Sequence, residues 1–193
     1  NLQKAKTHLE LASRLEPLYA PYLVQLGKLY LDWEQYAQSV TALEQAGKLS
    51  PGNSEIWMLL AEAYQAAGDL EKAALSAERA MDNLPDKSPA LILSGKIALM
   101  ANNPRSALSR AQSVLNSKSD HVQALHLMAH ALEALQRPDE AIALLDKYLP
   151  NIKDPIPTQM EKLMLLYRAR GLDAGLDALK QSVEQDNSSS PEL

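Results

Sequence analysis

A period of about 34 residues runs through the sequence, and this repetition constrains the fold more than any other feature. Small residues recur in two columns, namely Ala5, Ser39, Ala73, Ala107 and Ala141, and Gly27, Ala61, Gly95 and Ala129. Large apolar residues recur at Leu23, Trp57, Leu91 and Leu125, and prolines at Pro17, Pro51 and Pro85. A fixed period of this length is typical of stacked repeats, in which each unit buries its apolar face against its neighbours.

Residues 54–87 show what one period encodes. Apolar and small residues follow helical spacing from Ile56 to Tyr64 and again from Leu70 to Met81. Gly68 interrupts this spacing, and Asp69 can cap the next helix through its side-chain oxygen. Each period therefore predicts two helices that are joined by a tight turn.

Five residues of this segment match a known repeat pattern. Trp57, Leu60, Tyr64, Ala73 and Pro85 follow W-x2-L-x3-Y, then A, then P, so the chain resembles the tetratricopeptide repeat (TPR) family. The resemblance implies an all-α fold, a right-handed superhelical solenoid of antiparallel helix pairs with about eleven helices. It also implies a non-catalytic scaffold for protein–protein interaction, because packing positions rather than reactive groups define this family.

The register divides the chain into seven segments. These are the second helix of a truncated repeat at 1–19, four repeats at 20–53, 54–87, 88–121 and 122–155, a degenerate terminal helix pair at 156–186, and a disordered tail or linker at 187–193. Because residues 1–19 lack a partner helix, we expect a fragment of a longer protein; a half-repeat that acts as a cap is the alternative. Pro150, Pro155 and Pro157 predict a loop at 150–157, with helices at about 158–170 and 173–185.

Charge and composition exclude several classes of function. The net charge is −5 without a basic stripe, so we expect no nucleic acid partner. The sequence has no long apolar run of the kind that spans a bilayer, so we expect no direct membrane insertion. The absence of cysteine excludes disulfides but leaves the compartment open, since cytoplasmic and bacterial periplasmic proteins both fit.

The sequence shows no arrangement of residues that predicts catalysis or a cofactor. No glycine-rich phosphate loop and no nucleophile motif is present, so we expect no enzyme. His126 and His130 share a helix face at a spacing that suits zinc or nickel, but the glutamate of the H-E-x-x-H motif is missing. We therefore expect no metal, and interpret both histidines as polar residues of an exposed face. Trp57 is expected in the core, and Trp33 partly exposed at a turn.

By resemblance to the family, the first helix of each repeat lines a concave groove. The lining residues expected here are Val24, Lys28, Leu31, Met58, Glu62, Gln65, Ile92, Lys96, Leu99, His126 and His130. We expect this groove to hold a segment of another protein against Met58, Ile92 and Leu99. Lys28, Glu62 and Lys96 alternate in sign, and either pair with one another or set the register of the partner.

Two interpretations of the groove remain open at this level. The leading one is a scaffold within a larger bacterial-type assembly or transport protein, whose groove binds a partner protein. The alternative is a module for self-association, in which the helix of residues 1–16 or the last helix pair docks on another copy, so a homo-oligomer is possible.

Overall fold

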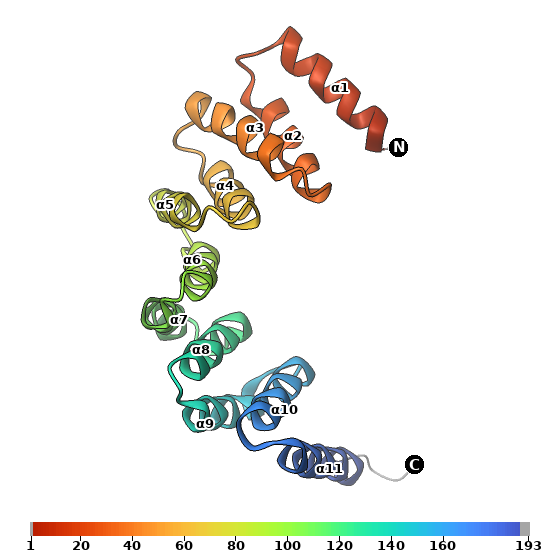
Figure 1. Ribbon diagram of the computed structural model, residues 1–193, viewed down its shortest axis with the longest axis vertical. Coiled ribbons are helices and arrows are strands. Elements are labelled where there is room, and N and C mark those ends of the chain that lie inside the picture. The colour runs from red at the N-terminus through yellow and green to blue at the C-terminus, as the bar shows by residue number, and fades with distance from the viewer. Residues whose placement is uncertain (1, 190–193) are drawn as a thin grey trace. The chain divides into compact units, whose positions relative to one another are not determined.

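The computed structural model describes residues 2–189 and, within them, the side chains of residue 4 and of residues 6–181. All regular structure in this part is helical: it holds eleven α-helices and one 3-10 turn, without a strand (Figure 1). The predicted all-α fold with eleven helices is confirmed. None of the described helices combines the length and the apolar character that crossing a membrane requires.

The helices form two compact units, which meet at the bond between Asn103 and Pro104. The first unit consists of α1 (Leu2–Leu15), α2 (Ala20–Asp32), α3 (Tyr36–Leu49), α4 (Ser54–Ala66), α5 (Leu70–Ala80) and α6 (Ser88–Met100). The second unit consists of α7 (Pro104–Ser117), α8 (Val122–Ala134), α9 (Pro138–Tyr148), η1 (Leu149–Asn151), α10 (Ile156–Arg170) and α11 (Leu172–Ser189). The boundary between the units thus falls inside the segment 88–121, between its two helices.

Each unit is built by stacking helices in chain order. In the first unit, α2 packs on α3 and α4 packs on α5, and in the second α8 packs on α9. We call the even-numbered helices from α2 to α10 the first helices, and the odd-numbered ones the second helices. First helices also contact one another within a unit: α2 contacts α4, α4 contacts α6, and α8 contacts α10.

The small-residue columns lie where first and second helices approach most closely. The side chains of Ser39, Ala73, Ala107 and Ala141 are completely buried. The Ser39 hydroxyl donates to the Gly27 carbonyl at 2.8 Å. A Cβ atom on Gly27 would lie 2.4 Å from Cγ of Leu43, which is far inside van der Waals contact. The repeat period therefore marks positions where a larger side chain would force the helices apart.

The turns between paired helices repeat the same backbone conformation. The left-handed region of φ is occupied at Glu34 (57°), Gly68 (84°), Asn102 (55°) and Gln136 (61°), which are each one repeat period apart. Asp69 then caps α5, since its carboxylate accepts from the Lys72 amide at 3.2 Å. The predicted turns are confirmed, and three of the four use a residue that adopts this conformation at a cost.

The C-terminal helix pair differs from the prediction at both ends. α10 begins at Ile156 rather than near 158, because proline is tolerated within the first turn of a helix. The predicted loop at 150–157 also contains part of the 3-10 turn η1. α11 continues through Ser189, so residues 187–189 of the predicted tail are helical. Residues 190–193 of that tail lie outside the described residues.

Candidate functional site

The predicted groove residues do not share one environment. The first lining position of each first helix is occupied by Val24, Met58, Ile92 and His126. Val24 is only 6% exposed and Ile92 only 3%, so the prediction that these two side chains line an open surface is wrong. The reason is visible at Val24: α2 contacts α4, so the side chain joins the core cluster instead of facing solvent. Ile92 occupies the same register position and is also buried.

The second lining position is open to solvent and carries the alternating charges. Lys28 forms an ion pair with Glu55 at 2.5 Å rather than with Glu62, although pairing among Lys28, Glu62 and Lys96 was one expectation. Protein atoms around the Glu62 carboxylate partly desolvate it and raise its pKa, although the side chain still reaches solvent. The ammonium group of Lys96 opposes this rise. Lys96 therefore acts on Glu62 through its charge alone, which falls short of the ion pair that Lys28 forms with Glu55.

The remaining predicted residues of the first unit are intermediate in exposure. Leu31 and Met58 are partly buried and pack against the core cluster. Leu99 is also partly buried, whereas its neighbour Met100 is 54% exposed. The side-chain amide of Gln65 lies 3.1 Å from the sulfur of Met100 and so links α4 to α6. The surface of the first unit is thus a mixture of charged groups and half-covered apolar groups.

In the second unit, the two predicted histidines have different partners. His126 Nε2 lies 3.1 Å from the hydroxyl of Thr158, which is completely buried on α10. Burial lowers the pKa of His126, with a smaller contribution from His130, while the Glu161 carboxylate opposes the shift. His130 instead faces carboxylates, at 3.6 Å from Glu161 and 4.0 Å from Glu133.

Arg168 completes a charged cluster between α8 and α10. Its guanidinium group donates two hydrogen bonds to Glu133, at 2.6 and 3.0 Å, and lies 3.4 Å from Glu161. We call His130, Glu133, Glu161 and Arg168 the α8–α10 cluster. Among the described residues, no three side chains of histidine, cysteine, aspartate or glutamate are arranged to hold a metal ion. That the chain binds no metal stays a prediction, which a zinc titration followed by thermal melting would test.

Three exposed apolar residues of α10 were missed by the sequence reasoning. Met160, Met164 and Tyr167 are 52%, 46% and 49% exposed. They lie one repeat period after His126, His130 and Glu133, so they continue the lining positions into the fifth first helix. The signal was available, because the three residues follow helical spacing at the expected period. It was overlooked because Leu163 replaces the small residue of the packing column, and this pair was therefore treated as degenerate.

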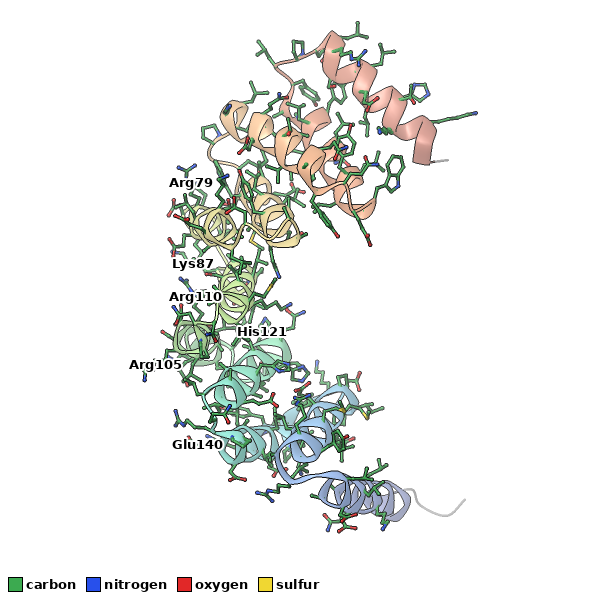
Figure 2. All side chains as sticks on the ribbon, viewed as in Figure 1. Arg79, Lys87, Arg105, Arg110, His121 and Glu140 are labelled. Atoms are coloured by element: carbon green, nitrogen blue, oxygen red, sulfur yellow. The ribbon has the colours of Figure 1, made fainter. Side chains whose placement is uncertain are left out.

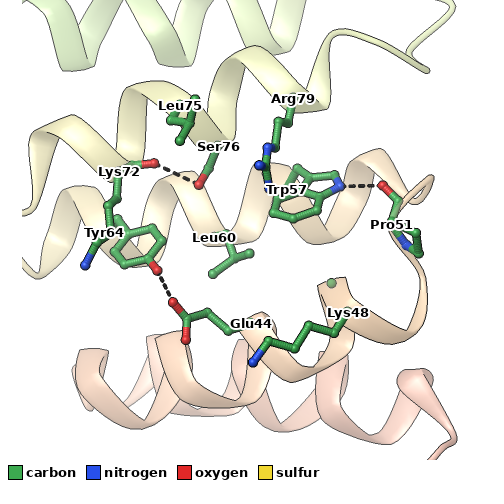
Figure 3. Close-up of a pocket in the computed structure, with 11 residues that line it drawn as sticks. Glu44, Lys48, Pro51, Trp57, Leu60, Tyr64, Lys72, Leu75, Ser76 and Arg79 are labelled. Atoms are coloured by element: carbon green, nitrogen blue, oxygen red, sulfur yellow. Dashed lines mark hydrogen bonds between the residues drawn. The ribbon is translucent and has the colours of Figure 1, made fainter.

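The opposite side of the helix pairs carries a cavity that the sequence did not suggest. It has a volume of about 450 Å³ and lies between α3 and α5, with α4 as its floor (Figure 3). Trp57, which was expected in the core, does pack against the core cluster, but it lines this cavity and is only partly buried. Its indole Nε1 donates to the Pro51 carbonyl at 2.7 Å, which fixes the ring at the rim. Trp33 is partly exposed, as predicted.

Comparison with protein families identifies the repeat. The family model described as tetratricopeptide repeat matches residues 30–97, and the model described as anaphase-promoting complex, cyclosome, subunit 3 matches residues 67–148. Comparison with curated proteins finds no match.

Solved structures of low sequence identity show the same fold. A tetratricopeptide repeat protein from Parabacteroides merdae is similar with a TM-score of 0.82 and 18% identity, over 98% of this chain and 74% of that one. PilW, described as a widely conserved type IV pilus biogenesis factor, has a TM-score of 0.76 and 13% identity, over 98% and 87%. YrrB, described as a TPR protein with an unusual peptide-binding site, has a TM-score of 0.64 and 13% identity, over 91% of each chain. With the repeat register, the helix pairs and the two family models in agreement, the chain belongs to the tetratricopeptide repeat family.

Proposed function

We propose that this interaction scaffold binds a segment of a partner protein along the first helices of its second unit. One observation carries the proposal, the exposed apolar row of Met160, Met164 and Tyr167 on α10. At the open second lining position, four repeats carry a polar residue, and only the fifth carries an apolar one, Met164. An apolar row on a solvated helix face is a common mark of an interaction site.

The residues of the row suit a partner segment whose apolar side chains can vary in shape. Methionine side chains are flexible and polarizable, so they adapt to differently shaped apolar groups. Tyr167 adds a large ring with a polar end, which is the kind of residue that dominates binding energy at interfaces. Because the receptor surface is already formed by packed helices, little ordering cost falls on the scaffold.

The α8–α10 cluster gives the partner a preferred charge. Glu133 and Glu161 together carry two negative charges beside the single guanidinium of Arg168. The cluster is therefore net acidic next to the apolar row. The proposed partner segment carries apolar side chains on one face and a lysine or arginine beside them, which would set its orientation more than its affinity.

The cellular role that we propose is a place within a bacterial-type assembly or transport system. Its support is a likeness of fold to PilW, which is described as a pilus biogenesis factor, and to YrrB, which is described as having a peptide-binding site. Identities of 13% carry only the fold, so the choice of process rests on this likeness and on the interaction surface.

Selection of peptides on the immobilised chain, followed by affinity measurement, tests the proposal. Met164→Asp should weaken the selected peptides about thirtyfold, which corresponds to about 2 kcal/mol for an interface hot spot. Met100→Asp, at an exposed methionine of α6, is the matched control and should leave the affinity unchanged. Both variants should keep the wild-type melting temperature. Unchanged binding by Met164→Asp would contradict the proposal.

Self-association is a second candidate, favoured by exposed leucines on outer helices. Leu172 and Leu176 of α11 are 61% and 43% exposed, and Leu11 and Leu15 of α1 are 54% and 74% exposed. Sedimentation velocity over a hundredfold range of concentration tests this candidate. A dimer that is lost in Leu176→Glu supports it, whereas a monomer at every concentration rejects it.

A further inference from the structure

The cavity between α3 and α5 can be compared with a second cavity of the same unit, which the preceding repeat forms. A second cavity, of about 430 Å³, lies between α1 and α3 over α2. Ten of the eleven residues that line each cavity lie one repeat period from a lining residue of the other. We call the cavity between α3 and α5 the Trp57 cavity and the other the sister cavity. Their shared geometry is a product of the repeat, so any function must come from the side chains that differ.

Both cavities share a polar contact at one end. The Tyr64 hydroxyl donates to Glu44 in the Trp57 cavity, and the Tyr30 hydroxyl donates to Glu10 in the sister cavity at 2.9 Å. The repeated pair joins a first helix to the preceding second helix. It therefore explains why a carboxylate lies in each cavity without invoking a ligand.

The wall that α5 contributes is different in chemistry. Lys72, Leu75 and Arg79 of the Trp57 cavity stand where the sister cavity has Gln38, Thr41 and Gln45. Two neutral amides and a hydroxyl are thus replaced by two cations and a leucine that is 53% exposed. Lys48, one turn after the single carboxylate Glu44 on α3, adds a third cation to the lining, and Arg14 holds the equivalent position of the sister cavity. This basic and apolar lining belongs to a chain whose net charge is −5.

Aromatic rings hold two of the cations in place (Figures 2 and 3). Arg79, which projects from α5, lies 4.8 Å from the ring centre of Trp57, and the Lys72 ammonium lies 5.3 Å from that of Tyr64. Lys72 is already neutralised by Asp69 at 3.0 Å. Within the described part of the chain, by contrast, neither Lys48 nor Arg79 forms an ion pair with a carboxylate. The end of the cavity near Trp57 is therefore positive, and Leu60 and Leu75 provide an apolar surface beside it.

We propose that the Trp57 cavity binds an acidic peptide segment of a partner protein, with one large aliphatic side chain next to a carboxylate. The aliphatic group contacts Leu60, Leu75 and the Trp57 ring, and the carboxylate pairs with Arg79 and Lys48. The volume of the cavity falls in the range of ligand pockets. Charge complementarity selects the peptide, because the Trp57 end offers two uncompensated cations and the sister cavity lacks the equivalent of Arg79.

The test uses the full chain and a labelled synthetic peptide that contains Glu-Leu-Glu-Leu between Gly-Ser flanks, read by fluorescence anisotropy. Arg79→Gln copies the residue of the sister cavity and should weaken binding about three- to tenfold. The triple variant Lys72→Gln, Leu75→Thr, Arg79→Gln should weaken it further, and added salt should do the same. All three replacements already occur at equivalent positions of this chain, so we expect the fold to be retained.

Two controls separate this site from the proposed surface on α10. Met164→Asp should leave the affinity for the Glu-Leu peptide unchanged, whereas a loss of binding there would place the peptide on α10 and overturn the proposal. A matched peptide with Gln in place of Glu should bind at least about fivefold more weakly. The proposal is overturned if the Gln peptide binds equally, if the triple variant binds like the wild type, or if the Glu-Leu peptide does not bind the wild type.

Discussion

The first helices of the two units use the same register to make different surfaces. In the first unit, the open positions carry Lys28, Glu62 and Lys96, and the apolar side chains beside them are largely covered. In the second unit, α10 exposes Met164 at the equivalent position, beside a charged cluster. The register fixes which positions reach solvent, but the residue type decides whether such a position is a solvated face or an interaction surface.

The comparison also shows that the first lining position is covered to different degrees along the chain. Val24 and Ile92 share a register position with His126, and all three are at least half covered by protein. A polar residue is accepted there only with a partner, as for His126 with Thr158. The first lining position is therefore a packing position at Val24, Ile92 and His126, but it opens to solvent on α10, where Met160 is 52% exposed.

The largest expected effect is the difference in stability between a charge placed at the buried first position and one placed at the open second position. Ile92→Asp buries a carboxylate without a partner and should lower the free energy of unfolding by about 3 kcal/mol or more. Met164→Asp lies at an open position and should change it by less than about 0.5 kcal/mol. Urea unfolding measures both. A cost below about 1 kcal/mol for Ile92→Asp would show that its position is not a packing position.

Larger side chains in the small-residue column should lower the stability of both units by a similar amount. Ala73 and Ala141 are completely buried at equivalent positions of the two units. Ala73→Leu and Ala141→Leu should each destabilise by about 1–3 kcal/mol, because the second helix must move away from the first. Ala66→Leu, at an exposed residue of α4, is the control. A neutral result in only one unit would mean that the two units pack by different rules.

Glycine should increase stability at the turn positions that have a positive φ. Glu34→Gly in the first unit and Gln136→Gly in the second should each stabilise by up to about 1 kcal/mol, because glycine enters the left-handed region without a steric cost. Gly68→Ala should destabilise by about 1 kcal/mol for the same reason. Thermal unfolding of the three single variants gives the answer, and a destabilised Glu34→Gly would point to a side-chain contact of Glu34 that outweighs strain.

The smallest expected effect is a pH dependence of stability, which arises from His126 in the second unit. Burial lowers the pKa of His126 below its ordinary value of 6.5, so the unfolded chain binds this proton more readily than the folded chain. The contribution of His126 is therefore present above about pH 6.5 and is lost as the pH falls toward the lowered pKa. His126→Asn should reduce the loss of stability between pH 7 and pH 5 relative to the wild type. An equal loss in both proteins would contradict this assignment.

The periodic pattern was sufficient to predict the fold. Helix pairs, turns near 34, 68, 102 and 136, and buried small residues such as Ala73 all follow from spacing, because close stacking of helices requires them. The start of α10 and the extent of α11 were missed, since prolines and weak helix formers are tolerated near helix ends and mark a boundary only loosely.

The sequence by itself determined which side of each first helix lines the surface, and the tertiary structure decided which of those side chains are available. Val24, Ile92 and Met160 share a register position in the sequence, but the structure buries the first two and leaves Met160 52% exposed. The cavity beside Trp57 has the same origin, because its lining comes from α3, α4 and α5 together. A local pattern specifies the direction of a side chain on its own helix, whereas its solvent access depends on atoms that are distant in the chain.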